Sequence, residues 1–238
     1  MRRHHRTPFV DLRRPQLLLA LSGTLLAGQA PAQSLLSGGE RRPLPNCTVT
    51  PEQTEGPYFI DTRLDRSDLR TDFSDKSAKP GVPLILQLRV HAVRNDTCTP
   101  LAGAIVDVWH CDAGGVYSGI ETKNSSFLRG YQTTDNNGKV QFQTIYPGRY
   151  PGRTVHIHFK VRARNRTGIA HEFTSQLYFD DAVTARVHQH PAYAGQRGTA
   201  VSNTQDGLFR HGGPGLMLTL RQAGDAYVAT FDIGLRLT

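Results

Sequence analysis

The 238-residue sequence contains no stretch of 18 or more apolar residues. Because a helix that crosses a bilayer needs about 20 such residues, a polytopic membrane protein is excluded. Runs of five or more like charges are also absent, which argues against a disordered acidic or basic tail. The 23 glycines and 14 prolines follow no repeating period, which excludes a collagen-like chain. The length suits one folded domain, or at most two small ones.

The excess of basic residues is concentrated at the start of the chain. The formal net charge is +8, from 28 Lys and Arg against 20 Asp and Glu. Residues 1–32 hold five arginines and one acid, followed by an apolar stretch and the small residues Ala30-Pro-Ala32, as in a signal peptide. Without this leader, 23 basic and 19 acidic residues remain, a net charge of +4. These basic residues do not cluster, so no nucleic-acid partner is predicted.

Arg13 and Arg14 stand directly before the apolar stretch, a pattern that resembles a twin-arginine export signal. An ordinary secretory signal with paired arginines is the alternative. Either route predicts an exported protein, periplasmic or extracellular, without a stable membrane anchor. We expect residues 33–50, which are polar and contain Pro and Gly, to form a tether, and residues 51–238 to form the folded domain.

Three cysteines allow at most one internal disulfide and leave one thiol over. Cys47 and Cys98 each lie in a polar stretch that we interpret as loop, so we favour that pair. Cys111 lies within a strand pattern and is equally consistent with a small buried apolar residue. The sequence alone leaves the connectivity open.

The sequence pattern predicts short strands separated by turns. Residues 84–93 alternate between apolar and polar for most of their length, which predicts a strand with one buried face. Residues 95–100 are expected to form a turn and residues 134–138 a hairpin loop. Further strands are expected at 104–111, 139–145, 154–161, 173–179, 216–220 and 227–235. With no long helical period, the pattern predicts a single-domain all-β sandwich, antiparallel or mixed, with long active-site loops.

Two histidines and two tyrosines suggest a metal site. On a strand, His156 and His158 point to the same face and can reach one ion. In isolation, such a pair is also consistent with ordinary packed or solvated histidines. Tyr117 follows a glycine turn, and Tyr150 ends the sequence Tyr-Pro-Gly-Arg-Tyr shortly before the histidines. Two phenolic oxygens with two imidazoles favour a trivalent iron over zinc.

Taken with its neighbouring motifs, the sequence resembles the intradiol ring-cleavage dioxygenases, the group of protocatechuate 3,4-dioxygenase and catechol 1,2-dioxygenase, and most of all their small secreted members. The resemblance covers roughly residues 46–180, and the family's core is a β-sandwich. The matching motifs, in order, are Thr54-Glu-Gly-Pro-Tyr-Phe, Val106-Asp-Val-Trp-His-Cys-Asp-Ala-Gly-Gly-Val-Tyr, Phe127-Leu-Arg-Gly, Pro147-Gly-Arg-Tyr, Arg153-Thr-Val-His-Ile-His and Gln176-Leu-Tyr-Phe.

The resemblance implies a non-haem Fe(III) centre that cleaves catechol-type aromatics with O2 to cis,cis-muconate-type diacids. It also implies roles for individual residues. Tyr150 is expected to act as a base in addition to binding iron, Arg153 to stabilise charge on the substrate, and Gln176 to line the pocket. Trp109, His110 and Asp112 are expected to pack around the site. The implied iron ligands are Tyr117, Tyr150, His156 and His158.

Two other functions are considered beside this one. The first is a metal-free secreted β-sandwich that serves as a binding module. The second is a zinc-dependent hydrolase that uses His156 and His158 with a carboxylate.

The segment from Tyr150 to His156 is shorter than in the large intracellular members of the family, which predicts a more open site. The ring substituents of the substrate and the oligomeric state are left open by the sequence.

Overall fold

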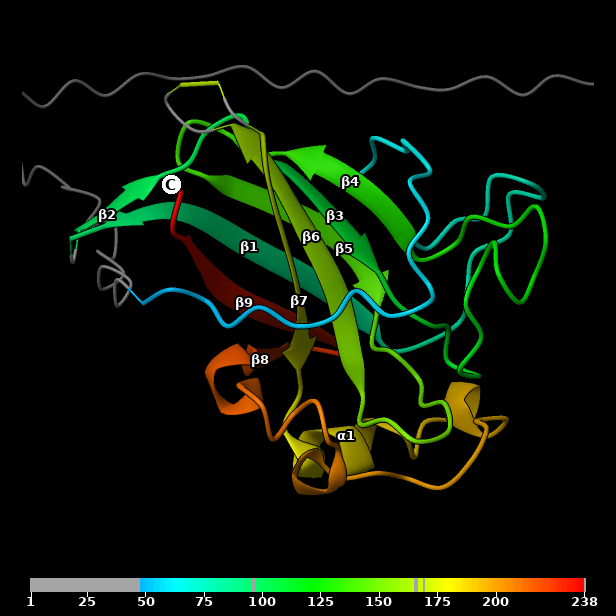
Figure 1. Ribbon diagram of the computed structural model, residues 1–238. Helices are drawn as coiled ribbons and strands as arrows, with labels where there is room; N and C mark the ends of the chain where they lie inside the picture. The colour runs from blue at the N-terminus through cyan, green and yellow to red at the C-terminus, as the bar shows by residue number, and fades with distance from the viewer. Residues whose placement is uncertain (1–47, 96, 165–166, 169, 238) are drawn as a thin grey trace, which may run out of the picture. The chain divides into compact units, whose positions relative to one another are not determined.

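The structure is a computed structural model, and it describes residues 48–95, 97–164, 167–168 and 170–237. These residues form nine strands in two sheets (Figure 1). The strands are β1 (Pro83–Arg94), β2 (Thr97–Pro100), β3 (Ile105–Trp109), β4 (Arg129–Thr133), β5 (Lys139–Ile145), β6 (His156–Arg164), β7 (Ala170–Tyr178), β8 (Thr219–Ala223) and β9 (Ala226–Leu235).

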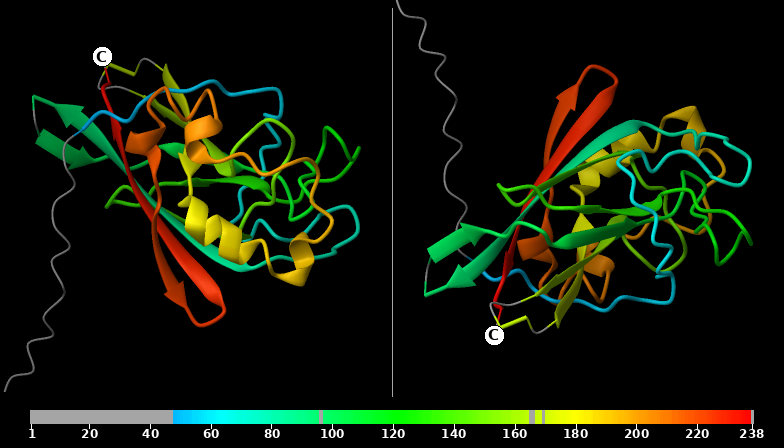
Figure 2. Two further views of the ribbon diagram at one scale, coloured as in Figure 1. Left: turned by 90° about the horizontal axis from the view of Figure 1, so that it is seen from below. Right: turned by 90° about the horizontal axis from the view of Figure 1, so that it is seen from above.

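The first sheet is built around β1. One edge of β1 pairs with β5 along its first half and with β2 along its second half. The other edge pairs with β9, which lies between β1 and β8. The pairing of β1 with β9 is parallel and the remaining pairings are antiparallel, so the sheet is mixed. Figure 2 shows β1 and β9 running side by side.

The second sheet has the order β4-β3-β6-β7 and is antiparallel throughout. Alternate side chains of the two sheets form the hydrophobic core. Leu84, Leu86 and Leu88 contribute from β1, and Ile157 and Phe159 from β6. Because side chains alternate along a strand, the residues between them in β6 lie on the opposite face of the second sheet.

The segment before β1 crosses both sheets. Residues 50–60, here called the strap, run past the end of β9 and the middle of β7 (blue in Figure 1). Thr50 N donates to Gly234 O at 2.9 Å, and Gln53 N donates to Thr174 O at 3.0 Å. Further along, Arg66 N donates to Tyr131 O in β4 at 3.0 Å. The segment therefore covers strand edges that would otherwise be unpaired.

The predicted all-β sandwich is confirmed, with local corrections. Residues 134–138, expected to form a hairpin loop, instead connect β4 in the second sheet to β5 in the first, and these two strands do not pair with each other. Thr97–Pro100, expected to be a turn, is a strand that pairs with β1. β4 was not expected, because its exposed half lacks an alternating apolar pattern. β8 begins at Thr219 rather than at residue 216, because Gly213–Leu216 form a 3-10 helix that contains a proline.

One short α-helix, α1 (Asp181–Val187), occurs in the described part of the chain, with the Asp180 carboxylate accepting from the N–H groups of Ala182 and Val183. None of the helices among the described residues has the length and apolarity needed to span a bilayer.

The expected leader and most of the tether lie outside the described residues, so the predicted boundaries stay predictions. Cys98 is disulfide-bonded, whereas Cys111 is free and buried. Cys47, the partner predicted for Cys98, also lies outside the described residues, and the pairing stays a prediction.

Candidate metal centre

The histidine pair lies on the face of the second sheet that is turned away from the core. In the register of the strands, His158 stands opposite Trp109 of β3 and Gln176 of β7. The Trp109 indole stacks on the His158 imidazole with ring centroids 5.0 Å apart. The strap passes over this row, since a Cβ added at Gly56 would lie 3.5 Å from His158 Cε1. The sheet and the strap thus enclose both imidazoles.

The two imidazoles face each other through their Nε2 atoms, which are 3.0 Å apart. His156 Nδ1 donates to Thr154 O at 2.6 Å, so its Nε2 carries the free lone pair. Burial, and to a smaller extent the nearby positive charge of Arg153, lowers the pKa of His156 to about 3. Burial also lowers the pKa of His158 well below its ordinary value. Both rings are therefore neutral, as metal ligands must be.

Two loops bring the tyrosines to the histidines. Tyr117 follows β3, Tyr150 follows β5, and their ring centroids lie 5.5 Å apart. The loops touch through their backbones at a glycine. Gly115 has φ +85°, and a Cβ added there would lie 2.1 Å from Arg149 O. A second glycine makes a similar contact, because a Cβ at Gly148 would lie 2.4 Å from Ala113 O. The glycines of both motifs are what allow this approach.

The tyrosine oxygens complete the cluster. Tyr150 Oη lies 3.1 Å from His156 Nε2. Tyr117 is fully buried, and within the described part of the chain its hydroxyl has no hydrogen-bond partner. Burial raises the pKa of both phenols. A buried hydroxyl without a partner is costly, and a metal ion beside it would remove that cost.

These donors fit a ferric ion. Two phenolic oxygens and two neutral imidazoles form a mixed hard-oxygen and nitrogen set, which suits trivalent iron. The zinc alternative needs a carboxylate next to His156 and His158. Among the described residues, however, no group of three or more His, Cys, Asp and Glu side chains is placed to hold a metal. The sequence-predicted ligands are thus brought together, and a zinc set of that kind is not.

Tyr58 of the strap closes one side of the cluster. Its ring stacks face to face on Tyr117, with centroids 4.0 Å apart and planes 2° apart, and meets Tyr150 edge-on at 5.7 Å. The carbonyl of Tyr58 accepts a hydrogen bond from Arg129 Nη1 at 3.2 Å, and Arg129 Nε donates to Ser118 Oγ at 2.8 Å. Buried Arg129 therefore ties the strap to the residue next to Tyr117.

Arg153 and Gln176 lie beside the histidines, as predicted. Arg153 Nη2 donates to Gln176 Oε1 at 2.6 Å, and Gln176 Nε2 donates to Thr54 O of the strap at 3.1 Å. Arg153 Nε donates to Asp206 Oδ2 at 2.7 Å. Sequence reasoning missed Asp206, which lies in a loop far along the chain with no motif around it.

The residues expected to pack around the site do so. His110 is fully buried and satisfied at both nitrogens, with Nδ1 2.8 Å from Cys111 O and Nε2 2.7 Å from Thr144 Oγ1. Burial lowers the pKa of His110 to about 4. The Asp112 carboxylate accepts from Val116 N at 3.0 Å and so shapes the turn that leads to Tyr117.

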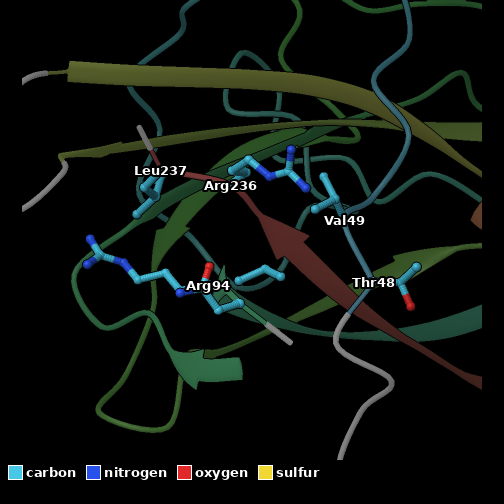
Figure 3. A pocket seen from close by; sticks show the side chains of 7 residues that line it. Thr48, Val49, Arg94, Arg236 and Leu237 are labelled. Atoms are coloured by element: carbon cyan, nitrogen blue, oxygen red, sulfur yellow. The ribbon is translucent and has the colours of Figure 1, made fainter. Parts of the chain in front are cut away.

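A cavity of about 730 Å³ lies elsewhere, at the ends of β1 and β9 (Figure 3). Its lining includes Val49, Arg94 and Arg236. None of the tyrosines and histidines of the cluster lines it.

Comparison with known proteins agrees with this geometry. The sequence model of the dioxygenase family matches residues 54–190. Chlorocatechol 1,2-dioxygenase of Pseudomonas sp. (strain P51) is 32% identical over 145 residues, which are 53% of this chain and 54% of that protein. Catechol 1,2-dioxygenase 2 of Acinetobacter lwoffii is 32% identical over 133 residues, 48% of this chain and 46% of that protein. The chain thus spans about half the length of the curated relatives it matches.

Solved structures match over more of their length. An intradiol ring-cleavage dioxygenase from Tetranychus urticae has 30% sequence identity and a TM-score of 0.68, covering 80% of this chain and 95% of that one. The dioxygenase domain of a dioxygenase and carbohydrate-binding fusion from Streptomyces sp. SirexAA-E has 36% identity and a TM-score of 0.60, covering 80% of this chain and all of that one. With its β-sandwich, its motifs in order and its clustered tyrosines and histidines, the chain belongs to the intradiol ring-cleavage dioxygenase family.

Proposed function

We propose that the protein cleaves catechol-type aromatics between their two hydroxyl-bearing carbons, using O2 and a non-haem Fe(III) ion, to give cis,cis-muconate-type diacids. The observation that carries the proposal is the convergence of four donors, with Tyr150 Oη 3.1 Å from His156 Nε2 and the two Nε2 atoms 3.0 Å apart. Tyr117, Tyr150, His156 and His158 would hold the ion. When bound, a ferric ion acts as a Lewis acid toward the catechol oxygens.

Tyr150 is the proposed proton acceptor. It is partly exposed, whereas Tyr117, His156 and His158 are at most 2% exposed, so an entering catechol meets Tyr150 first. A phenolate at this position can take a proton from a catechol hydroxyl as general base. Tyr117, locked between Tyr58 and the sheet, is suited to remain in place.

Arg153 is proposed to stabilise the charge that develops on the ring, and Gln176 to line the pocket and hold Arg153. The guanidinium is partly buried beside the histidines, where a fixed positive charge acts more strongly than in water. Gln176 is fully buried and hydrogen-bonded on both sides, so it holds the guanidinium rather than being free to rotate. Tyr58 and Trp109 supply flat apolar surfaces next to the donors.

A visible absorption spectrum tests the proposal, recorded before and after anaerobic addition of catechol. Phenolate bound to Fe(III) is expected to give a broad visible band that moves to longer wavelength when catechol binds, and admitting O2 should then yield a muconate-type product. Tyr117→Phe and Tyr150→Phe should weaken the band, whereas Tyr131→Phe, on β4 away from the donors, should leave it unchanged. A protein that stays colourless after reconstitution with iron would refute the ferric site.

We also propose that the protein is exported, because residues 1–32 have the arginine-rich start and apolar stretch of a signal peptide. Determining the N-terminus of the protein recovered from the periplasm or medium tests this. A mature chain that begins at residue 33 supports the leader, and a chain retained in the cytoplasm with residues 1–32 intact contradicts it.

A further inference from the structure

Asp206 is a fully buried carboxylate that the family match does not include, since that match ends at residue 190. It follows a short 3-10 helix at Asn203–Gln205. Both of its oxygens are fully used. Oδ1 accepts from Leu208 N at 2.7 Å and Phe209 N at 3.1 Å. Oδ2 accepts from Thr154 N at 2.8 Å and Arg153 Nε at 2.7 Å.

The charge on Asp206 is matched by its surroundings. Burial alone would raise the pKa of the carboxyl, but the N–H of Thr154 and the Arg153 guanidinium outweigh burial and lower it. A buried ionised pair of this kind is stable only when each partner is hydrogen-bonded, as it is here. Asparagine at this position would retain one acceptor oxygen and place an amide NH2 against N–H donors.

Two separate groups therefore hold the Arg153 guanidinium. Asp206 accepts from Nε, and Gln176 accepts from Nη2 at 2.6 Å. Because the guanidinium is planar, two fixed nitrogens define the orientation of the whole group. Without these partners the long arginine side chain would sample many rotamers, and fixing it in one orientation would cost conformational entropy.

The loop that carries Asp206 is docked independently of Arg153. Asn203 Nδ2 donates to Phe179 O at 2.8 Å, and Thr154 Oγ1 donates to Asn203 Oδ1 at 2.8 Å. Asn203 N also lies 3.1 Å from the Asp181 carboxylate. Contacts that do not involve the Arg153 side chain thus also hold the carboxylate in place.

We propose that Asp206 is a positioning residue, which fixes the Arg153 guanidinium at the angle needed to stabilise charge on the substrate ring. The inference rests on the proposed ring cleavage and deepens it, because it makes the orientation of Arg153 depend on a segment beyond the matched family region.

A double-mutant cycle tests this proposal in the iron-loaded protein. The variants are Asp206→Asn, Arg153→Ala and the two combined. Thr204→Ala is the matched control, because Thr204 is an exposed residue of the same loop and its hydroxyl pairs with Ser202 Oγ at 3.3 Å rather than with Asp206 or Arg153. The rate constant kcat on catechol and the anaerobic dissociation constant Kd of catechol are measured for each. Iron content and the visible band of the protein without catechol verify that the metal centre is intact.

We expect Asp206→Asn to lower kcat by about 10- to 100-fold, as expected for a misplaced catalytic group, and to weaken anaerobic catechol binding, with iron content unchanged. In the Arg153→Ala background the same change should alter kcat and Kd by less than about twofold. Thr204→Ala should stay within about twofold of the unmutated protein, because it changes only an exposed side chain. Equal losses from Asp206→Asn in both backgrounds, or equal losses from the control, would overturn the proposal.

A further variant covers the case in which Asp206→Asn does not fold. Arg153→Lys keeps the positive charge but lacks the fork that spans Asp206 and Gln176. It should lose kcat nearly as much as Arg153→Ala, and full activity would overturn the proposal. A wild-type protein that binds iron but cleaves no catechol refutes the proposed function, whereas cleavage that is insensitive to Asp206→Asn refutes only the role of Asp206.

Discussion

Gly115→Ala is expected to pull the two tyrosine loops apart. Gly115 has φ +85°, a conformation that alanine adopts only with strain, and its added Cβ would lie 2.1 Å from Arg149 O. The loop that carries Tyr117 and the loop that carries Tyr150 meet at this contact. A methyl group there cannot be absorbed by a rotamer change, because the atom it meets belongs to the backbone.

The expected losses of activity and stability follow from the overlap between the added Cβ and Arg149 O. Since carbon and oxygen atoms need more than 3 Å, the loops must separate by about 1 Å, enough to cost about 100-fold in activity when reacting groups are misplaced. The left-handed backbone costs about 1–2 kcal/mol and the steric insertion about 1–3 kcal/mol. For a domain of this size, a loss of about 2–5 kcal/mol lowers the Tm by about 4–20 °C.

Thermal unfolding by circular dichroism, iron content and the visible band would be measured together. Gly114→Ala is the matched control, since its φ is not positive and its Cβ would meet only Asp112 Oδ1 at 3.4 Å. We expect Gly114→Ala to resemble the unmutated protein and Gly115→Ala to lose stability, iron and colour. If the two variants behaved alike, the backbone contact would not be what assembles the centre.

Three further expectations concern the metal, a buried histidine and the strap. Removing iron with a chelator should lower the Tm by about 5–10 °C, and Fe(III) should restore both Tm and colour in a calorimetric and spectroscopic titration. Burial lowers the pKa of His110 to about 4, below the value near 6.5 of an unfolded chain, so the unfolded state gains protons first as the pH falls. Urea unfolding should therefore show about 2 kcal/mol less stability from this group at pH 5 than at pH 7, a difference absent in His110→Gln. Tyr58→Ala should cost about 1 kcal/mol beyond lost burial, because it removes the ring stacked 4.0 Å from Tyr117, and should raise KM more than it lowers kcat in steady-state assays.

Much of the fold was predictable from local patterns. The alternation in residues 84–93 is a direct consequence of one buried face, and β1 covers this range. β2 was missed because its four residues are mostly exposed and are ordered by pairing with β1. The parallel match of β1 with β9 depends on tertiary closure, which no local pattern encodes.

The candidate site also has residues that the sequence predicted and residues that it did not. The spacing of His156 and His158 places them on one face, and the structure brings their Nε2 atoms to 3.0 Å. Tyr117 and Tyr150 were candidate donors from the sequence, but their assignment as iron ligands came from the family resemblance, since glycine turns and single tyrosines are common. Asp206 was beyond prediction, because its partner Arg153 lies 53 residues earlier and meets it only in the folded chain.

The placement of β9 has a consequence for the order of events in folding. This strand comes last among the described strands, yet it lies inside the first sheet and pairs with β1 from Leu84↔Tyr227 to Ala92↔Leu235. Contacts so distant in sequence slow folding to milliseconds or longer, and β1 leaves the backbone groups of one edge unpaired until residues 226–235 have emerged from the ribosome. The chain is therefore most prone to aggregate before residues 226–235 are available for pairing, and deleting this one strand would leave that edge open permanently.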